Sequence, residues 1–556
     1  MTSGARPRNV ADYLPAMAAE RPDAVAMYIP KKSRSEGGRD YDELSYRRLA
    51  ERAERIAAGL LVSGLKKGDH VALMVRPGED FFALMFGLFE AALVPVLIDP
   101  GIGKKNLGVC LTRAKPVAFI GIPVAHAARI TLGWARESLR QNITVGRRWF
   151  WGGYTLAGIE RAGAEALAKG VPLPEVAPED PAAILFTSGS TGPAKGVVYT
   201  HGNFTAQVEA LRDMFGIQPG EVNLPTFPPF ALFDPALGVT SVIPFMDPTR
   251  PADVDPREVI EPVRRFSVTM MFGSPALLNT VGRYADAENV KLPSLRRVIA
   301  AGAPLPASTI ERWQRILSDD ARVYPPYGAT ESLPVACLSS DEIVNETWDR
   351  TDAGAGVCVG RKVESIELEI IAITDEPIAN FSDATLLPES EIGEIVVRGP
   401  QVTRAYFADP EHTALAKIRD DDGGVWHRMG DLGWRDREGR VWFCGRKSHR
   451  VVLPDRTLYT VPLEKIFDAH ERVFRSALVA PRVAGRIAPT LCLELERDAR
   501  VTLAELLPEL RVMGEIHADA AHIEHFLVHP GFPVDIRHNA KIDREALARW
   551  AEGKLR

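Results

Sequence analysis

The chain has 556 residues, of which 46% are hydrophobic and 25% are charged, so its composition excludes a disordered or fibrous protein. The net charge of −6 gives no electrostatic footprint for nucleic acid. The five cysteines are an odd number without a CxxC pair, which favours a reducing compartment over a disulfide framework or a zinc knuckle. The length allows roughly two to four domains.

No segment of the sequence is typical of export or of a membrane span. The first ten residues are polar and carry two arginines with no apolar region behind them, unlike a signal peptide. The most apolar stretch, residues 81–98, contains Glu90 and Pro95 and is shorter than the ~20 residues that a spanning helix needs. We therefore expect a cytoplasmic protein that has no membrane span and binds no nucleic acid.

Amphipathic helices alternate with short apolar runs through the first 300 residues. Residues 45–64 predict a helix with Ser45 as its N-cap, and residues 70–75 predict a buried strand. A second helix is expected over residues 80–92 and a second strand over residues 93–98. Further apolar runs lie at residues 183–186, 267–272 and 297–300. This alternation predicts an α/β fold in which helices cover parallel sheets.

The segment Arg147–Gly153 groups three aromatic residues with two arginines. When exposed, such a cluster is typical of a surface that binds a partner or a membrane. We favour partly buried core aromatics instead, because large aromatic side chains are usually mostly buried.

The pattern of the chain changes in its last third. Strand-like alternation predicts a β-rich lobe from residue 365 onward, in the segments 366–373, 393–399 and 440–445. Past Gly445-Arg446 the chain has the pattern of a small α+β unit of ordinary domain length. We therefore expect a large N-terminal domain over residues 1–445 and a small, mobile C-terminal lid domain over residues 446–556.

The segment Thr187–Gly196 places three glycines, four hydroxyl side chains and one lysine directly after a buried strand. Glycines let backbone N–H groups approach an anion, and the hydroxyls and the ammonium group add donors. The spacing is not that of a Walker A loop, because no Gly-Lys-Ser/Thr sequence follows. A flexible linker is the alternative for this composition. The strand before the segment and the strand-like residues after it favour a phosphate-binding loop.

This loop and four later segments resemble motifs of the adenylate-forming superfamily, which contains acyl-CoA synthetases, luciferases and peptide-synthetase adenylation domains. One of these motifs alone would be weak, but five in the family's order are specific. The matching segments are Thr187–Gly196, Ala301–Leu305, Tyr327–Ser332, Gly430–Gly433 and Gly445-Arg446. The resemblance implies that ATP and Mg²⁺ are the cofactors.

The resemblance also implies which residues bind the nucleotide. These are Thr187, Ser188, Gly189, Ser190, Thr191, Gly192, Lys195, Gly302, Ala303, Tyr327, Gly328, Ala329, Thr330, Asp431 and Arg446. Lys195 and the loop hydroxyls suit the β- and γ-phosphates, where the leaving diphosphate must be stabilised. Thr330 would contact the α-phosphate, and Glu331 would help to hold Mg²⁺, which prefers oxygen ligands. Asp431 would accept both ribose hydroxyls, and Arg446 would donate to the same sugar.

In this family, a lysine of the C-terminal domain closes over the site and bonds to the carboxylate and the α-phosphate. The matching residue is Lys541, although Ala540 stands where the family usually has glycine. A solvated surface lysine is the alternative. The catalytic residues that the resemblance implies are therefore Lys541, Lys195, Thr330 and Glu331.

The segment after the hinge departs from the pattern of enzymes that form thioesters with coenzyme A. Val452 stands where such enzymes have a lysine, and Asp455, preceded by Pro454, stands where they have a glycine. Neither Pro454 nor Asp455 offers glycine's freedom at positive φ. The sequence therefore argues against thioester formation.

The segment 227–238 contains three phenylalanines and lies where this family lines its acyl pocket. Together with residues 270–272 it indicates a long apolar acid rather than an amino acid as substrate. The predicted pocket residues are Phe230, Phe233, Asp234 and Phe272. Packing of these rings in an ordinary core is the alternative.

These features are most similar to the β-lactone synthetase branch of the superfamily, on the segments Phe230–Ala236 and Arg537–Arg544. In that branch a long-chain 2-alkyl-3-hydroxy fatty acid is activated with ATP and cyclises, with release of AMP and diphosphate, in long-chain olefin biosynthesis. The branch also implies association with other enzymes of that pathway. His201, His449 and His538 are candidates for a base that assists the internal hydroxyl.

Two other functions remain open at this point. A long-chain fatty acyl-CoA ligase or fatty acyl-AMP ligase would share the nucleotide motifs and differ at the hinge. A catalytically silent nucleotide-binding protein is disfavoured, because Lys195, Glu331, Asp431, Arg446 and Lys541 are all retained.

Overall fold

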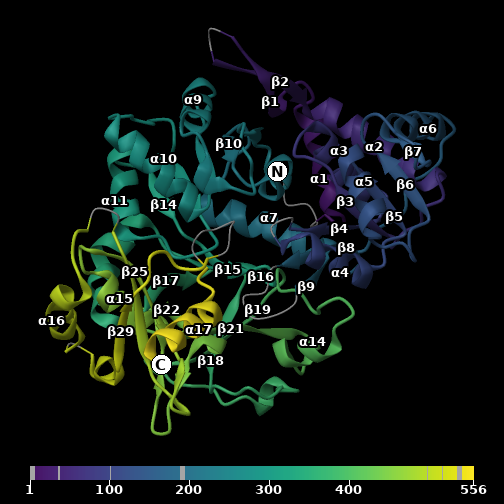
Figure 1. Ribbon diagram of the computed structural model, residues 1–556. Helices are drawn as coiled ribbons and strands as arrows, with labels where there is room; N and C mark the ends of the chain where they lie inside the picture. The colour runs from purple at the N-terminus through teal and green to yellow at the C-terminus, as the bar shows by residue number, and fades with distance from the viewer. Residues whose placement is uncertain are drawn as a thin grey trace.

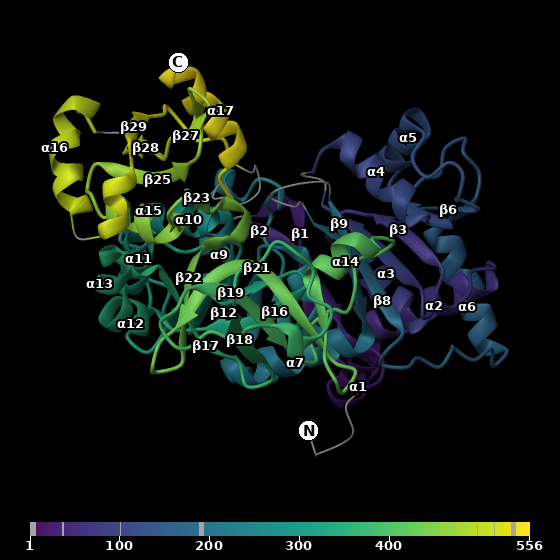
Figure 2. The same cartoon turned by 90° about the horizontal axis from the view of Figure 1, so that it is seen from below.

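The computed structural model describes residues 7–35, 38–99, 102–187, 194–496, 499–515, 517–534 and 541–556. Two seven-stranded sheets, a third antiparallel sheet and a small C-terminal unit make up the molecule (Figure 1). Figure 2 shows the C-terminal unit at one end of the molecule and helices α4, α5 and α6 at the other. Among the described residues no helix is both long and apolar enough to cross a membrane.

The first sheet has the strand order β7-β6-β5-β3-β4-β8-β9. Its strands are β3 (His70–Met74), β4 (Val94–Ile98), β5 (Ala118–Gly121), β6 (Gln141–Thr144), β7 (Tyr154–Thr155), β8 (Pro181–Thr187) and β9 (Lys195–Thr200). Every neighbouring pair is parallel except β8 and β9. The predicted parallel sheet is therefore confirmed.

Helices cover both faces of this sheet. They are α2 (Tyr46–Val62), α3 (Glu79–Glu90), α4 (Lys104–Ala114), α5 (Pro123–Leu132) and α6 (Leu156–Ala168). Val71 and Leu73 share a core cluster with α2, α3 and α6, whereas Ala72 and Phe119 share one with α4 and α5. The alternation follows from the two-residue period of a strand. Ser45 caps α2 as predicted, since its side chain accepts a hydrogen bond from the backbone N–H of Arg48.

The second sheet has the order β14-β13-β12-β10-β11-β1-β2 and is parallel except for the pair β1–β2. Its strands are β1 (Val25–Ser35), β2 (Gly38–Ser45), β10 (Val222–Pro225), β11 (Thr240–Val242), β12 (Met270–Gly273), β13 (Arg297–Ala300) and β14 (Arg322–Tyr324). The helices around it are α1 (Tyr13–Glu20), α7 (His201–Phe215), α8 (Asp234–Leu237), α9 (Arg257–Arg265), α10 (Pro275–Ala287) and α11 (Ala307–Ile316).

The third sheet is antiparallel and has the order β15-β16-β17-β22-β21-β19-β18, with β20 beside β21. Its strands are β15 (Tyr327–Ala329), β16 (Ser332–Cys337), β17 (Val357–Lys362), β18 (Glu367–Ile371), β19 (Gly393–Arg398), β20 (Lys417–Arg419), β21 (Val425–Arg435) and β22 (Arg440–Arg446). The lobe thus begins at Tyr327, earlier than the predicted residue 365. The short helices α12 (Ser340–Glu342) and α13 (Trp348–Arg350) interrupt the strand pattern between β16 and β17 and hide this start.

The C-terminal unit is a three-stranded sheet with helices. It consists of β25 (Val473–Val479), β28 (Thr490–Leu495), β29 (His525–Val528), α15 (Thr460–Asp468), α16 (Leu503–Gly514) and α17 (Arg544–Leu555). Two small hairpins complete it, β23 (Val451–Val452) with β24 (Thr457–Leu458) and β26 (Arg482–Val483) with β27 (Arg486–Ile487).

The junction before this unit is tight. Gly445 has φ +117°, and a Cβ at this position would lie 2.4 Å from Oγ1 of Thr460, so only glycine fits. Just after it, Lys447 Nζ lies 3.2 Å from Glu394 Oε2, and Arg450 pairs with Asp375 at 2.5 Å. These contacts hold the start of the C-terminal unit against the third sheet.

Candidate active site

Several of the predicted nucleotide residues lie at the carboxyl ends of strands, namely β8 of the first sheet and β13 and β14 of the second. Gly302 comes two residues after β13, Tyr327 comes three residues after β14, and Thr187 is the last residue of β8. Ligands of open α/β sheets bind beyond the carboxyl ends of parallel strands, where the loops diverge. The fold therefore brings these segments together although they are far apart in the sequence.

Asp431, Tyr327 and Arg446 form a cluster at this edge. Asp431 and Arg446 are direct neighbours across the pair β21–β22, and Arg446 Nη1 lies 3.0 Å from Asp431 Oδ1. The hydroxyl of Tyr327 donates a 2.7 Å hydrogen bond to Asp431 Oδ2. Nη1 of Arg446 also donates to the carbonyl oxygen of Met429 at 3.1 Å. The sequence motifs that predicted these three residues thus meet in space.

The carboxylate of Asp431 is suited to a sugar. It is 5% exposed, and burial raises its pKa against the opposing effect of Arg446. Its Oδ1 accepts no hydrogen bond of good geometry from the described residues, in spite of the ion pair with Arg446. A buried acceptor without a donor costs free energy, and a ribose hydroxyl supplies the donor. The unsatisfied Oδ1 of Asp431 is the structural observation that favours a nucleotide at this site.

Two residues of the segment that follows β19, Thr403 and Tyr406, donate hydrogen bonds to Glu331. The backbone N–H and the hydroxyl of Thr403 donate to the carbonyl oxygen of Glu331 at 2.9 and 3.1 Å. The hydroxyl of Tyr406 donates to Glu331 Oε1 at 2.7 Å, and no hydrogen bond among the described residues uses Oε2. One carboxylate oxygen is therefore available for a hard cation such as Mg²⁺.

Lys195 and Thr330 lie close to Glu331 and Tyr406. The ammonium of Lys195 lies 5.3 Å from the ring centre of Tyr406, and the hydroxyl of Tyr199 donates to the carbonyl oxygen of Thr330. Thr187 and Lys195 face each other across β8 and β9, so they hold the two ends of the predicted phosphate loop. Ser188, Gly189, Ser190, Thr191 and Gly192 lie outside the described residues.

Lys417 was not predicted from the sequence. It is 8% exposed, its Nζ donates to the carbonyl oxygen and the hydroxyl of Thr403, and within the described part of the chain no carboxylate lies within 4.0 Å of it. Burial lowers the pKa of this lysine to about 7, against the charge of Glu331. No local pattern marks Lys417, Thr403 or Tyr406, because the pairing of β20 with β21 creates this environment.

The predicted acyl residues surround one apolar pocket of about 60 Å³. The pocket is lined by Leu211, Phe215, Ile217, Asn223, Phe230, Phe233, Asp234, Leu237, Met270, Phe272, Ile299, Ala301, Pro326, Leu333 and Pro334. Ala301 adjoins Gly302, and Pro326 adjoins Tyr327, so the pocket borders the nucleotide residues. The rings of Phe230 and Phe272 stack at 4.0 Å, and ligand pockets usually measure ~300–1,000 Å³. A long chain therefore requires these rings to separate.

Asp234 is the polar exception in this pocket. Asn223 Nδ2 donates to its two oxygens at 3.0 and 2.9 Å, and the hydroxyl of Ser241 donates at 2.6 Å. Burial raises the pKa of Asp234 to about 7, although these bonds oppose the shift. A carboxyl so enclosed positions β10, β11 and α8 relative to one another and leaves the pocket wall otherwise apolar.

The candidate bases are placed as follows. His201 is fully buried beside the ring of Phe89, and burial lowers its pKa to about 4, so it is a core residue. His449 has a pKa lowered to about 3 by burial and by the charges of Arg544 and Arg446. His538 and the rest of the stretch 535–540 lie outside the described residues.

Lys541 is exposed and begins the last described segment. Three residues later, Arg544 pairs with Glu464 of α15 at 2.5 Å. This ion pair ties the segment that carries Lys541 to α15, the first helix of the C-terminal unit. Its catalytic role stays a prediction.

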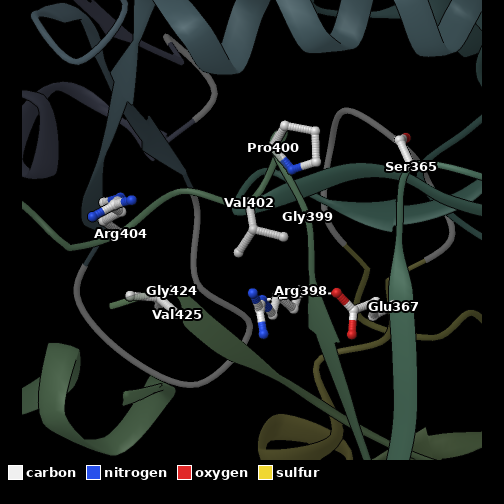
Figure 3. A pocket seen from close by; sticks show the side chains of 9 residues that line it. All are labelled: Ser365, Glu367, Arg398, Gly399, Pro400, Val402, Arg404, Gly424 and Val425. Carbon is white, nitrogen blue, oxygen red and sulfur yellow. Dashed lines mark ion pairs between the residues drawn. The ribbon is translucent and has the colours of Figure 1, made fainter. Parts of the chain in front are cut away.

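A pocket of about 280 Å³ on the third sheet was not predicted from the sequence (Figure 3). Its lining residues are Ser365, Glu367, Arg398, Gly399, Pro400, Val402, Arg404, Gly424 and Val425. Arg398 lies 3.8 Å from Glu367 and pairs with Asp420 and Asp422, so its charge is already balanced. The pocket contains none of the predicted site residues.

Comparison with known families and proteins agrees with this arrangement. The family described as AMP-binding enzyme matches residues 14–407. The chain is 51% identical over 549 residues to the olefin beta-lactone synthetase of Xanthomonas campestris pv. campestris, covering 98% of this chain and 97% of that protein. It is 50% identical to the olefin beta-lactone synthetase of Stenotrophomonas maltophilia, covering 99% of both.

Solved structures share the fold at lower identity. The amide bond synthetase McbA from Marinactinospora thermotolerans matches with a TM-score of 0.78 at 22% identity, covering 98% of this chain and 99% of that one. ATP-bound MatB from Rhodopseudomonas palustris matches with a TM-score of 0.75 at 20% identity, covering 99% of this chain and 100% of that one. At such identity the likeness concerns the fold alone.

Proposed function

The chain belongs to the AMP-binding enzyme family, and from that premise we propose that it is an AMP-forming ligase with olefin β-lactone synthetase activity. The proposed substrate is a long-chain 2-alkyl-3-hydroxy fatty acid, and the products are a β-lactone, AMP and diphosphate. The observation that carries the proposal is the 51% identity over 98% of the chain to a protein of that name.

In the first half-reaction, a carboxylate oxygen of the acid attacks the α-phosphorus of ATP, and diphosphate leaves. Lys195 and the loop hydroxyls are proposed to offset the charge of the leaving group, and Lys541 that of the reacting carboxylate and α-phosphate. Asp431 and Arg446 would hold the ribose. Glu331 would hold Mg²⁺, which screens the phosphate charge when it is bound.

In the second half-reaction, the hydroxyl oxygen on C3 attacks the activated acyl carbon. The bond from that carbon to the AMP oxygen breaks, the hydroxyl proton passes to the phosphate of the departing AMP or to solvent water, and a four-membered ring closes. Nucleophile and electrophile belong to one molecule, so a pocket that holds the chain bent replaces an external nucleophile by effective molarity. The apolar pocket beside Ala301 and Pro326 suits that task.

The segment after the hinge supports cyclisation over thioester formation. Pro454 and Asp455 form the tip of the hairpin β23–β24, closed by a 2.8 Å hydrogen bond from the N–H of Leu453 to the carbonyl oxygen of Arg456. None of residues 447–458, all of which the structure describes, has a positive φ. The flexible glycine turn that a thioester-forming relative uses here is therefore replaced by a closed turn.

Three finer statements belong to the same proposal. The unit after Gly445 acts as a lid that carries Lys541 to the site. The protein works in the cytoplasm. It acts alongside other enzymes of olefin biosynthesis, which supply its hydroxy acid and consume its lactone.

The test is proton NMR of the products from purified protein, MgATP and a synthetic 2-alkyl-3-hydroxy fatty acid, with and without coenzyme A. We expect the ring-proton signals of a β-lactone in the absence of coenzyme A, together with AMP. A product that forms only when coenzyme A is present would make the protein an acyl-CoA ligase and would contradict the role given to the hinge.

A further inference from the structure

One long segment of the chain is strongly basic although the chain as a whole is acidic. Residues 102–159 contain nine lysines and arginines and a single acidic residue, Glu137. This segment therefore has a net charge of +8 in a chain whose total is −6, which leaves −14 for the remaining residues. Seven of the nine cations are exposed, namely Lys104, Lys105, Lys115, Arg136, Arg140, Arg147 and Arg148.

These cations are not neutralised by the protein itself. Within the described ranges, the only one of the nine in an ion pair is Arg113, which contacts Asp409 at 3.3 Å. Arg148 donates to the carbonyl oxygen of Gly153, a neutral group. A concentration of unpaired positive charge attracts an anionic surface over about a Debye length.

The same segment exposes large apolar side chains. Seven of the fifteen exposed large hydrophobic residues of the described chain lie in it, namely Val109, Val124, Ile130, Leu132, Trp149, Phe150 and Tyr154. Phe150 is 81% exposed and Trp149 is 50% exposed. The prediction of core aromatics is therefore wrong for these two rings, because the loop turns them toward solvent and buries neither. Exposed apolar groups at such density mark an interaction surface.

Trp151 fixes these rings in place. Its indole stacks on the buried ring of His126 in α5 at 5.1 Å, and its Nε1 donates to Oγ1 of Thr144 at 3.0 Å. The ring centres of Trp149 and Phe150 lie 5.3 and 5.4 Å from that of Trp151. The anchored indole thus presents two aromatic rings to the outside.

Helices α4 and α5 and the loop after β6 share one side of the first sheet. Leu107 and Leu111 of α4 and Ala125 of α5 pack on the same core cluster with Phe119, on the face opposite to α2 and α3. The stack of Trp151 on His126 adds the loop 145–153 to that side. Figure 2 shows α4 and α5 together at the end of the molecule far from the C-terminal unit. We call the exposed side chains of α4, α5 and this loop the basic apolar face.

We propose that the basic apolar face docks the protein on an anionic lipid bilayer. Trp and Phe side chains favour the interface of a bilayer, and lysines and arginines are attracted to anionic headgroups. Protein interfaces are depleted in lysine, whereas two of the four exposed cations of this face, Lys104 and Lys105, are lysines. The rest of the chain has a net charge of −14, so the same bilayer repels it and the basic apolar face is favoured to point toward the lipid.

Such docking goes beyond the proposed reaction and gives it a source of substrate. A long-chain hydroxy acid partitions into membranes, so an enzyme held at the surface meets it at a higher local concentration. α4 also borders the strand that leads to the phosphate loop, since Cys110 and Ala114 pack with Ile184 and Phe186 of β8. The docked face and the strands that flank the phosphate loop therefore belong to one sheet.

The test is co-sedimentation of the full chain with vesicles of phosphatidylglycerol and phosphatidylcholine in equal parts, and with phosphatidylcholine alone. We expect binding to the mixed vesicles that weakens as salt is added. The double variants R147E/R148E and W149S/F150S should each reduce the partition coefficient by roughly tenfold or more. The control F474S changes a ring that is 43% exposed in β25, outside this face, and should bind as the unaltered chain does.

Two results would overturn the proposal. One is the absence of binding to mixed vesicles at low salt. The other is binding of a purified enzyme of the same pathway that both double variants abolish while vesicle binding is unaffected, which would assign the face to a protein partner. AMP release from detergent-dispersed substrate separates this test from the proposed reaction, because both variants should keep it unchanged. Melting curves establish that the variants fold.

Discussion

The nucleotide side and the acyl side of the candidate site hold their side chains by different forces. On the nucleotide side, Asp431, Tyr327 and Glu331 are fixed by short hydrogen bonds and an ion pair from separate strands. On the acyl side, Phe230 and Phe272 are held by ring packing in a pocket of about 60 Å³. Directional bonds define positions, whereas packed rings can slide. The first side is therefore preorganised, and the second must adapt to its ligand.

Each side also contains a buried titratable group that has no ion-pair partner among the described residues, and the pKa values of these two groups are shifted in opposite directions. Burial lowers the pKa of Lys417 to about 7 and raises that of Asp234 to about 7. Neither group has an oppositely charged partner close enough to cancel the cost of burial. The comparison between the two sides thus extends to their response to pH.

The largest effect is expected at Lys541, which belongs to neither side. Lys541→Ala should slow formation of the acyl adenylate by about a thousandfold, since a charge that stabilises the transition state is lost. ATP should bind as before. Exchange of labelled diphosphate into ATP measures the first quantity, and calorimetry the second. Lys554→Ala, an exposed lysine of α17, is the control. Equal loss of ATP binding would make Lys541 a structural residue.

A hundredfold effect is expected on the nucleotide side. Asp431→Ala should weaken ATP binding by about a hundredfold, because two ribose contacts disappear. It should also lower the free energy of unfolding by about 2 kcal/mol, since the Tyr327 hydroxyl loses its acceptor and Arg446, 37% exposed, loses its counter-charge. The KM for the acid should not change. An unchanged dissociation constant for ATP would remove Asp431 from the ribose site.

The acyl side should respond to pH through Asp234. Its folded pKa of about 7 lies above the ordinary value of 3.8, so between these pH values the folded state keeps a proton that the unfolded state has lost. The free energy of unfolding should therefore fall as pH rises through this window, by up to about 1.4 kcal/mol per pH unit. Urea denaturation of Asp234→Asn should show this slope removed. An unaltered slope would mean that Asp234 is ionised in the folded protein.

The nucleotide side should show the opposite slope through Lys417. Its folded pKa of about 7 lies below the ordinary value of 10.5, so between these values the unfolded state holds the extra proton. The free energy of unfolding should rise with pH in that window, by up to about 1.4 kcal/mol per pH unit. Lys417→Met should flatten this limb. If both proteins give the same curve, a counter-charge must accompany Lys417 in solution.

The smallest effect on activity is expected from removing one of the two stacked rings of the acyl pocket. Phe272→Ala removes one ring of the stack with Phe230, and the wider pocket should favour bulkier acids by about tenfold or less in kcat/KM. A series of acids of increasing chain length measures this preference. The KM for ATP should stay constant, which is the sharpest check that the two sides are independent. A parallel change in both constants would mean that the pocket and the nucleotide residues move together.

Much of this molecule could be predicted from its sequence. Period and capping placed α2, β3 and β13 to within a few residues, because local hydrophobic pattern decides those elements. The candidate nucleotide residues could be proposed because the family motifs that they match are contiguous in the sequence. Lys417 and Tyr406 could not, since what makes them part of the site is strand pairing and a distant glutamate. The exposure of Phe150 was missed because composition alone does not say whether an aromatic loop folds inward.

The position of Arg446 has a thermodynamic consequence. It is the last residue of β22, it begins the proposed lid, and its side chain completes the carboxylate cluster of Asp431 in the neighbouring strand. A rotation of the lid that moves Arg446 changes both its ion pair with that carboxylate and the donor that Arg446 would offer to a ribose. Occupancy by nucleotide and orientation of the lid are then linked functions. If a bound nucleotide stabilises one orientation of the lid by a given free energy, then fixing the lid in that orientation strengthens nucleotide binding by the same free energy.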